Sequence, residues 1–214
     1  MKRLLLFFCI IIIVNSCTKS DNSENLITKS DANFFALTVG NSWVYKNYQY
    51  NLVTETYDDT GVIDSISIVG IQDFSGETYY KFRTLTTGNE DTITFCNPNG
   101  ESFEFLREFE GNLINEEGSI KFTNSENEER LLQENEWGNV YETLLEGITV
   151  ISVEAGEFDC IKSERYAKNL DNEQLPGLDH FYYSNGIGLI YDTSSFVSKS
   201  IPTIIRRLDF YEVQ

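Results

Sequence analysis

Histidine and proline are scarce in this chain, which has one histidine, His180, and three prolines among 214 residues. A single histidine excludes a zinc site built from several histidines, and no serine lies in a Gly-x-Ser-x-Gly turn. Gly186 and Gly188 form a Gly-x-Gly pair without the third glycine or the following helix of a phosphate-binding loop. We therefore expect no enzyme activity, no metal and no cofactor. For His180 we expect a hydrogen-bonded position on a strand, with a hydrolase that uses a distant serine and aspartate as the alternative.

Positive charge is also scarce, since 16 lysines and arginines oppose 34 aspartates and glutamates, for a formal net charge of −18. The acids recur along the whole chain, as in Asp58-Asp59 and Glu126 to Glu129, which predicts a solvated exterior. A calcium loop is the sharper alternative, but no stretch has the regular Asp/Asn spacing with a closing glutamate. Such a surface repels nucleic acid and anionic headgroups, so we expect no nucleic-acid partner.

The hydrophobic run from Leu4 to Val14 follows Lys2 and Arg3 and spans eleven residues. It is too short for a permanent bilayer-spanning helix and suits the core of a signal peptide. Ser16 then precedes Cys17, the pattern of a bacterial lipoprotein signal, in which the cysteine thiol is acylated and the chain is cut before it. We predict a signal peptide over residues 1–16 and lipidation at Cys17. An ordinary secretory signal and a transmembrane anchor are the alternatives.

The segment after the cysteine is polar and lacks any hydrophobic pattern, so residues 17–33 are predicted to be the lipidated N-terminus and a flexible tether. Thr18, in place of an aspartate that would favour inner-membrane retention, indicates the outer membrane. Lys19 followed by Ser20-Asp21 partly resembles the export signal of Bacteroidota surface lipoproteins, with one acid where two are usual. We therefore expect a lipid anchor in the outer membrane, with the protein either periplasmic or surface-exposed, and a single β-rich domain over residues 34–214.

Four cysteines are present, but Cys9 leaves with the leader and Cys17 is the predicted acyl site. Outside the cytoplasm the remaining two, Cys96 and Cys160, can form a disulfide. Closing that loop of about 65 residues would stabilise the fold by on the order of 4 kcal/mol. Strand alternation places Cys160 beside Phe158 but Cys96 among threonines, so two separate thiols are the alternative.

Aromatic and β-branched residues favour sheet over helix, and no sustained 3.6-residue apolar period appears. The segments that read as strands are Trp43 to Tyr50, Val62 to Ile71, Glu77 to Thr86, Thr92 to Cys96, Ser102 to Phe109, Leu113 to Asn115, Ile120 to Thr123, Ile148 to Val153, Phe158 to Tyr166, His180 to Ser184, Leu189 to Tyr191 and Ile204 to Val213. Asp58 to Gly61 reads as a hairpin turn, and Glu128 to Glu136 as a turn or short helix. In Ser102 to Phe109, three phenylalanines share the face expected to be buried. These features predict an all-β fold, either an antiparallel barrel or a strongly curved sheet of about 10–12 strands, with a β-sandwich as the alternative.

Three stretches resemble motifs of uncharacterised exported lipoproteins of Bacteroidota. They are Leu37-Thr38-Val39-Gly40-Asn41-Ser42-Trp43-Val44-Tyr45, Ala155-Gly156-Glu157-Phe158-Asp159-Cys160-Ile161-Lys162 and Tyr182-Tyr183-Ser184-Asn185-Gly186-Ile187-Gly188-Leu189-Ile190. The resemblance extends to TapB-like proteins and other exported β-rich domains of unknown function. It implies a curved sheet comparable to that of LolA and LolB, but it brings no known activity and no catalytic residues. The glycines of these motifs also suit ordinary turns.

These observations lead to two expectations for function. The first is a non-catalytic binding or interaction role in the cell envelope, with an envelope protein, a glycan or a lipid as partner. The second is a carrier or acceptor of lipid or lipoprotein with a hydrophobic cavity, which rests on fold analogy.

Overall fold

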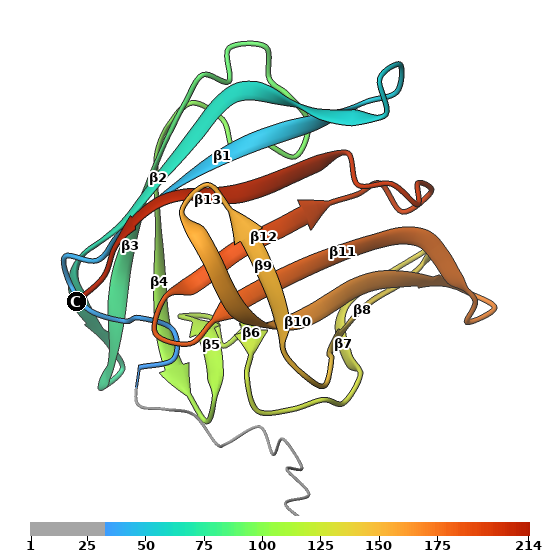
Figure 1. Ribbon diagram of the computed structural model, residues 1–214. Helices are drawn as coiled ribbons and strands as arrows, with labels where there is room; N and C mark the ends of the chain where they lie inside the picture. Colours follow the sequence, from blue (N-terminus) through green and yellow to red (C-terminus); the bar gives the residue numbers. More distant parts are fainter. Residues whose placement is uncertain (1–32) are drawn as a thin grey trace, which may run out of the picture.

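The computed structural model describes residues 33–214, which form one antiparallel sheet (Figure 1). Its strands are β1 (Ser42–Asn51), β2 (Thr56–Phe74), β3 (Glu77–Thr87), β4 (Gly100–Phe109), β5 (Asn112–Asn115), β6 (Ile120–Thr123), β7 (Arg130–Asn135), β8 (Gly138–Leu144), β9 (Thr149–Val153), β10 (Gly156–Asn169), β11 (Gln174–Ser184), β12 (Gly188–Ser194) and β13 (Ile204–Glu212). The all-β, antiparallel prediction is confirmed, with 13 strands instead of 10–12. Of the architectures considered, the curved sheet is the one observed: within this range there is a single sheet, and it does not close into a barrel. No helix in residues 33–214 is long and apolar enough to cross a membrane.

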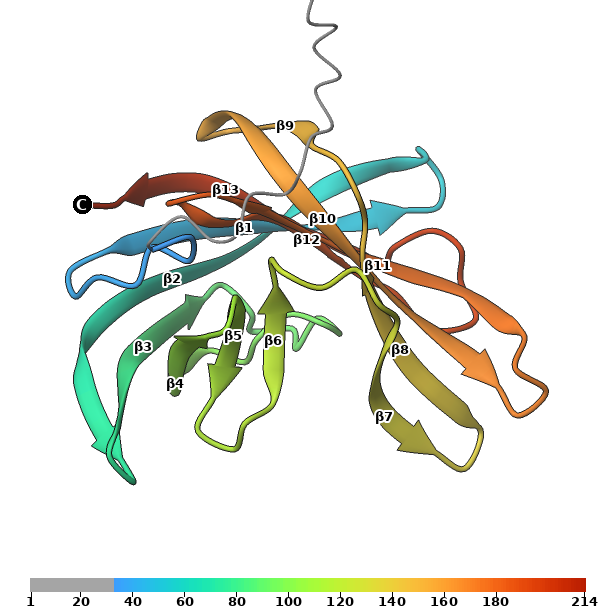
Figure 2. The same cartoon turned by 90° about the horizontal axis from the view of Figure 1, so that it is seen from below.

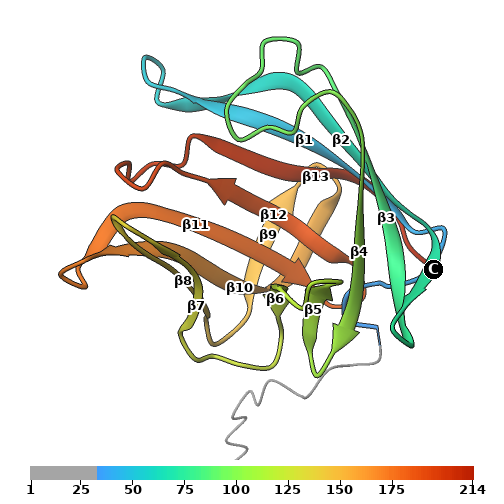
Figure 3. The ribbon, with the colours of Figure 1, turned by 180° about the vertical axis from the view of Figure 1, so that it is seen from behind.

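The sheet consists of two meanders joined through the first and last strands. Its strand order is β6-β5-β4-β3-β2-β1-β13-β12-β11-β10-β8-β7. Strand β9 lies outside this order and pairs with β10. Ser42 of β1 pairs with Glu212 of β13, so the two ends of the described chain meet at the middle of the sheet (Figure 3). Every strand pair is antiparallel, so neighbours in each meander need only short connections.

The sheet is strongly curved, and its two outer parts bend towards the same side (Figure 2). Figure 2 shows β3 to β6 on one side of the hollow and β7 and β8 on the other. Several bulges accompany this curvature, including register shifts in the pairs of β1 with β2 and of β2 with β3. Bulges increase local twist and bend a strand, which gives the sheet a concave and a convex face.

The expected turn at Asp58 to Gly61 is wrong, because these residues lie inside β2. The chain reverses earlier, at residues 52–55, where Asn51 Oδ1 accepts hydrogen bonds from the amides of Val53 and Thr54. At Gly61 (φ +76°) the strand has a bulge, where Asp59 Oδ1 accepts a hydrogen bond from the Gly61 amide. Turn-forming residues therefore mark a kink within one long strand here.

Two further segments differ from the sequence expectation. Residues 92–96 form a turn and not a strand, since Thr92 and Phe95 have φ of +51° and +70° and the Cys96 amide donates to the Ile93 carbonyl. The stretch from Glu128 to Glu136 contains β7 and no helix. Its weak apolar stripe gives a helix little to bury, whereas as an edge strand it pairs with β8.

Candidate functional site

The concave face contains a cavity of about 530 Å³. Its wall is contributed by β1 to β6, β10 to β13 and the chain just before β1. The aromatic and aliphatic lining residues are Phe35, Trp43, Tyr45, Ile66, Phe82, Phe103, Leu106, Leu113, Phe181, Tyr183 and Leu189. The charged lining residues are Glu104, Lys121, Arg165, Asp192 and Arg206. The wall therefore combines aromatic and aliphatic side chains with polar and charged groups, and the volume is in the range of small-molecule sites.

Trp43 and Tyr45 fix the aromatic wall at the centre of the sheet. They are consecutive inward-facing residues of β1, because side chains alternate along a strand. The Trp43 indole donates to the Ile187 carbonyl at 2.7 Å, and the Tyr45 hydroxyl donates to the Leu189 carbonyl at 2.8 Å. Burial raises the pKa of Tyr45 far above its ordinary value, so it stays a neutral donor. Trp43 is therefore held by the β11–β12 turn and Tyr45 by the start of β12.

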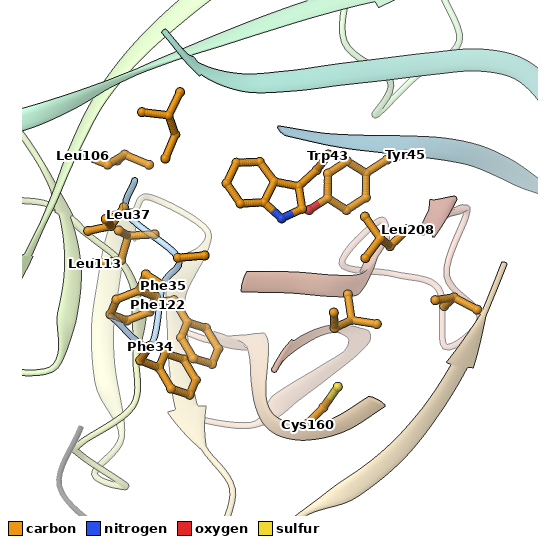
Figure 4. Packing of buried hydrophobic residues seen from close by; sticks show 14 of the residues in the cluster. Phe34, Phe35, Leu37, Trp43, Tyr45, Leu106, Leu113, Phe122, Cys160 and Leu208 are labelled. Atoms are coloured by element: carbon orange, nitrogen blue, oxygen red, sulfur yellow. The ribbon is translucent and has the colours of Figure 1, made fainter. Parts of the chain in front are cut away.

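Aromatic side chains from distant parts of the chain pack together next to the cavity, and Figure 4 shows Phe34, Phe35 and Phe122 among them. Phe122 of β6 stacks on Tyr183 of β11 with ring centroids 3.9 Å apart, although β6 and β11 are far apart in the strand order. Phe35 packs edge-on against both rings, at 6.3 Å and 6.2 Å. The chain before β1 thus joins the two arms of the sheet in this cluster, where Phe34 and Leu37 are also buried.

Asn41 holds the buried segment Phe34–Leu37 in place. Its side chain is fully buried, donates from Nδ2 to the Ala36 carbonyl at 2.8 Å, and accepts the Gln214 amide at 3.0 Å. Gly40 has φ +100° and its amide donates to the Ile68 carbonyl, so the turn predicted at this position is confirmed. The first and third sequence motifs meet here, through the bond from Trp43 to Ile187.

A network of buried charged and polar groups lies beside the aromatic wall. Arg206 of β13 donates from Nε and Nη2 to the two oxygens of Asp192, at 3.0 Å and 2.6 Å. Its guanidinium also covers the Tyr45 ring at 5.1 Å. Asp64 of β2 is 1% exposed and lies 3.8 Å from Arg206 Nη1. Although burial opposes its charge, the two aspartates raise the pKa of Arg206 above its ordinary value.

A second ionic group lies on the arm formed by β7, β8 and β10. Glu142 is 2% exposed and pairs with both Arg130 and Arg165, at 2.6 Å and 2.8 Å. The Arg165 guanidinium covers the Phe181 ring at 4.5 Å. Burial, opposed by Glu142, lowers the pKa of Arg130. The buried Glu142 carboxylate thus holds Arg165, which lines the cavity, through an ion pair that it shares with Arg130.

The phenylalanines of β4 are not the buried side that the alternation predicts. Leu106 is the buried residue of this strand and lines the cavity with Ser102 and Glu104, whereas Phe103, which also borders the cavity, and Phe109 remain 49% and 48% exposed. Both exposed rings are covered by cations, with Lys81 4.4 Å from the Phe103 ring and Arg107 4.9 Å from the Phe109 ring. These contacts stabilise aromatic groups outside the core.

His180 is a half-buried strand residue of β11, with Nδ1 3.5 Å from Glu164 Oε1. Burial, reinforced by Lys162 and opposed by Glu164, lowers its pKa, so the imidazole is neutral at pH 7. Nδ1 has no hydrogen-bond partner, whereas the backbone amide donates to Thr193 Oγ1. Side chains alternate along β11, which places its neighbours Asp179 and Phe181 on the other face.

The other sequence-predicted positions are dispersed. Cys17 and its acylation lie outside the described residues. Cys96 and Cys160 are free thiols in the structure, Cys160 buried in the core and Cys96 half-buried in the β3–β4 loop. Gly186 and Gly188, with φ of +72° and +100°, form the predicted β11–β12 turn. Among residues 33–214 no three or more His, Cys, Asp or Glu side chains are grouped to hold a metal.

Sequence reasoning missed the charged residues of the concave face. Asp64, Glu142 and Arg206 look like ordinary surface charges in the sequence, since each lies in a strand with other polar residues. The one available signal was the alternation of β1, which places Trp43, Tyr45 and Asn47 on one side.

Two solved structures are similar to this chain. A protein of Bacteroides fragilis, described as a "putative exported protein with YmcC-like fold", aligns with a TM-score of 0.51 and 11% identity, over 85% of this chain and 100% of its own. A "putative lipoprotein" of Parabacteroides distasonis aligns with a TM-score of 0.44 and 14% identity, over 86% and 100%. No family model and no curated protein matches the sequence. At this identity the first likeness shows the fold alone, so the expected resemblance to exported Bacteroidota proteins holds at that level.

Proposed function

We propose that this protein is a lipoprotein of the bacterial cell envelope, anchored through acylated Cys17, that binds a small amphipathic molecule in its concave cavity without transforming it. The observation that carries the proposal is the 530 Å³ cavity, in which rigid aromatic rings lie beside buried ion pairs. These rings and ion pairs are already held by other contacts. Binding a ligand therefore requires little further ordering of the side chains of the site, which favours affinity. The outer membrane, with a periplasmic or surface-exposed orientation, is the proposed location.

A carrier for acyl chains is the less favoured function. Arg165, Asp192 and Arg206 reach the cavity wall, and an acyl chain against them would remove water from these charges without replacing its hydrogen bonds. A ligand with polar groups of its own avoids that cost.

The test uses a tryptophan that fills the cavity. Ser102 is an exposed residue of β4 whose side chain lines the cavity, so Ser102→Trp blocks the space with little effect on folding. Ser67→Trp is the matched control, because Ser67 lies on the outer face of β2, opposite Arg83 in the register. Native mass spectrometry of the protein expressed without residues 1–17, together with Nile red titration, measures binding.

We expect the unmodified cavity and the Ser67→Trp variant to bind Nile red with similar affinity, and Ser102→Trp to lose most of that binding. A copurified small molecule should disappear in the same variant. If neither Nile red nor any copurified molecule is sensitive to Ser102→Trp, the proposed function is wrong.

A further inference from the structure

A second, polar pocket adjoins the aromatic cavity. It has a volume of about 170 Å³ and is lined by Asn47, Asp64, Phe95, Asn97, Asp192, Ser194, Ile204 and Arg206. Asn97, Asp192 and Arg206 line both spaces, so the two are contiguous. Together they form one site with a small polar end and a larger aromatic end.

The polar end holds two carboxylates and one guanidinium. Arg206 uses Nε and Nη2 on Asp192, which leaves only Nη1, at 3.8 Å, near Asp64. The donors that hydrogen-bond to Asp64 are neutral: Thr86 Oγ1 at 2.5 Å, Asn97 Nδ2 at 3.1 Å and Asn47 Nδ2 at 3.1 Å. The two carboxylates share one guanidinium, so the group carries one net negative charge, and Asp64, which is 1% exposed, has the weaker ion pair with Arg206.

The other charges of the concave face compensate one another. Glu104 pairs with Lys121. Glu142 is shared by Arg130 and Arg165, and Asp179 lies opposite Arg165 in the register of β10 and β11. The net negative charge of the concave face thus belongs to the group of Asp64, Asp192 and Arg206, which lines the polar pocket. A buried charge of this kind is costly without a counter-charge.

We propose that the site selects molecules that carry a single ammonium group on an apolar body, with the ammonium in the polar pocket near Asp64 and the body against the aromatic wall. This inference deepens the proposed function and rests on it. An ammonium has three donors, and Asp64 with the side-chain oxygens of Asn47 and Asn97 supplies acceptors. Asn47 and Asn97 both donate to Asp64 through Nδ2, so their oxygens are the atoms left to accept. The net charge of −18 also attracts cations and repels anions over longer distances.

The experiment compares three probes with the same body: 4-phenylbutylamine, 4-phenylbutanol and 4-phenylbutanoate. Their affinities for the protein without residues 1–17 are measured by isothermal titration calorimetry at pH 7. We expect the amine to bind at least about tenfold more tightly than the alcohol, because its ammonium can form charge-assisted hydrogen bonds to a buried carboxylate. The acid should bind most weakly.

Asp64→Asn should remove the preference for the amine and leave the binding of the alcohol intact. Asp91→Asn is the control, because it removes one acid of the exposed β3–β4 loop and tests whether overall charge accounts for the preference. Should Asp64→Asn fail to fold, Asn97→Lys tests the same pocket, since Asn97 is exposed and a lysine there would occupy the ammonium position.

Equal or tighter binding of the alcohol or the acid would overturn the inference, as would an amine preference that survives both Asp64→Asn and Asn97→Lys. If all three probes bind equally and Ser102→Trp abolishes their binding, the proposed function stands and the ammonium preference fails. If none of the probes binds and Nile red is also insensitive to Ser102→Trp, both proposals fail.

Discussion

Replacing Asn41 by alanine should destabilise the protein far more than its single side chain suggests. The carboxamide is fully buried and bonds to the Ala36 carbonyl at 2.8 Å and to the Gln214 amide at 3.0 Å. Asn41→Ala leaves the buried Ala36 carbonyl without its partner, removes the bond to the amide of the exposed Gln214 and empties a fully buried site, and a buried unpaired group alone costs about 1–3 kcal/mol. We therefore expect a loss of about 2–4 kcal/mol, a large part of the stability of a typical domain.

The matched control is Asn51→Ala at the other end of β1. Asn51 also makes side-chain bonds, to Asp58 Oδ2 at 2.7 Å and from the Val53 amide at 2.9 Å, but these bonds are exposed and water can replace them. Its loss should cost less than about 1 kcal/mol.

Urea unfolding of the protein without residues 1–17, followed by far-UV circular dichroism, measures both variants. The midpoint should fall strongly for Asn41→Ala at an unchanged slope, which marks a change of stability and not of the unfolded state. If Asn41→Ala costs no more than Asn51→Ala, the account of how the segment Phe34–Leu37 is held is refuted.

Three further predictions follow from burial. Phe122→Ala should cost about 3–5 kcal/mol in urea unfolding, and the exposed Phe109→Ala less than about 1 kcal/mol, because Phe122 is 0% exposed and stacks on a tyrosine ring. Burial raises the pKa of Cys96 to about 11 and that of Cys160 to about 12, so both should react slowly with Ellman's reagent in the native protein. The unfolded, unreduced protein without Cys17 should titrate two thiols, and a titre of zero would reveal a disulfide. Burial also raises the pKa of Asp179 to about 6, above its unfolded value, so its contribution to stability is present at low pH and is lost as pH rises from about 4 to 6. Asp179→Asn should therefore stabilise the protein by about 1–3 kcal/mol at pH 7.5 and little at pH 4, which thermal unfolding at the two values checks.

The sequence predicted the strand that lies between clear turns, and failed where turn residues serve another purpose. Trp43 to Tyr50 was found almost to the residue, because its aromatic and β-branched residues follow the Gly40-Asn41 turn and precede a further turn. The predicted turn at Asp58 to Gly61 was wrong because the residue types that form turns also form bulges. Only the pairing of β1 with β2 distinguishes a turn from a bulge here.

The faces of β4 could not be predicted from alternation alone. The alternation predicts that the three phenylalanines form the buried side, yet Glu104 and Leu106 line the cavity, and Lys81 and Arg107 cover the exposed rings of Phe103 and Phe109. The candidate site depended on strand order in the same way. Asp64 and Arg206 are 142 positions apart in the chain, and they meet only because β13 pairs with β1, which pairs with β2.

The pairing of β1 with β13 at the centre of the sheet has a consequence for how the protein acquires its structure. The strand that joins the two meanders, residues 204–212, is the last one to leave the ribosome. Before it is available, β1 and β12 each have an unpaired edge, and the concave face cannot form because its halves are not connected. If the protein is exported as proposed, a chain that crosses a membrane as an extended thread would complete this sheet only after residues 204–212 have passed.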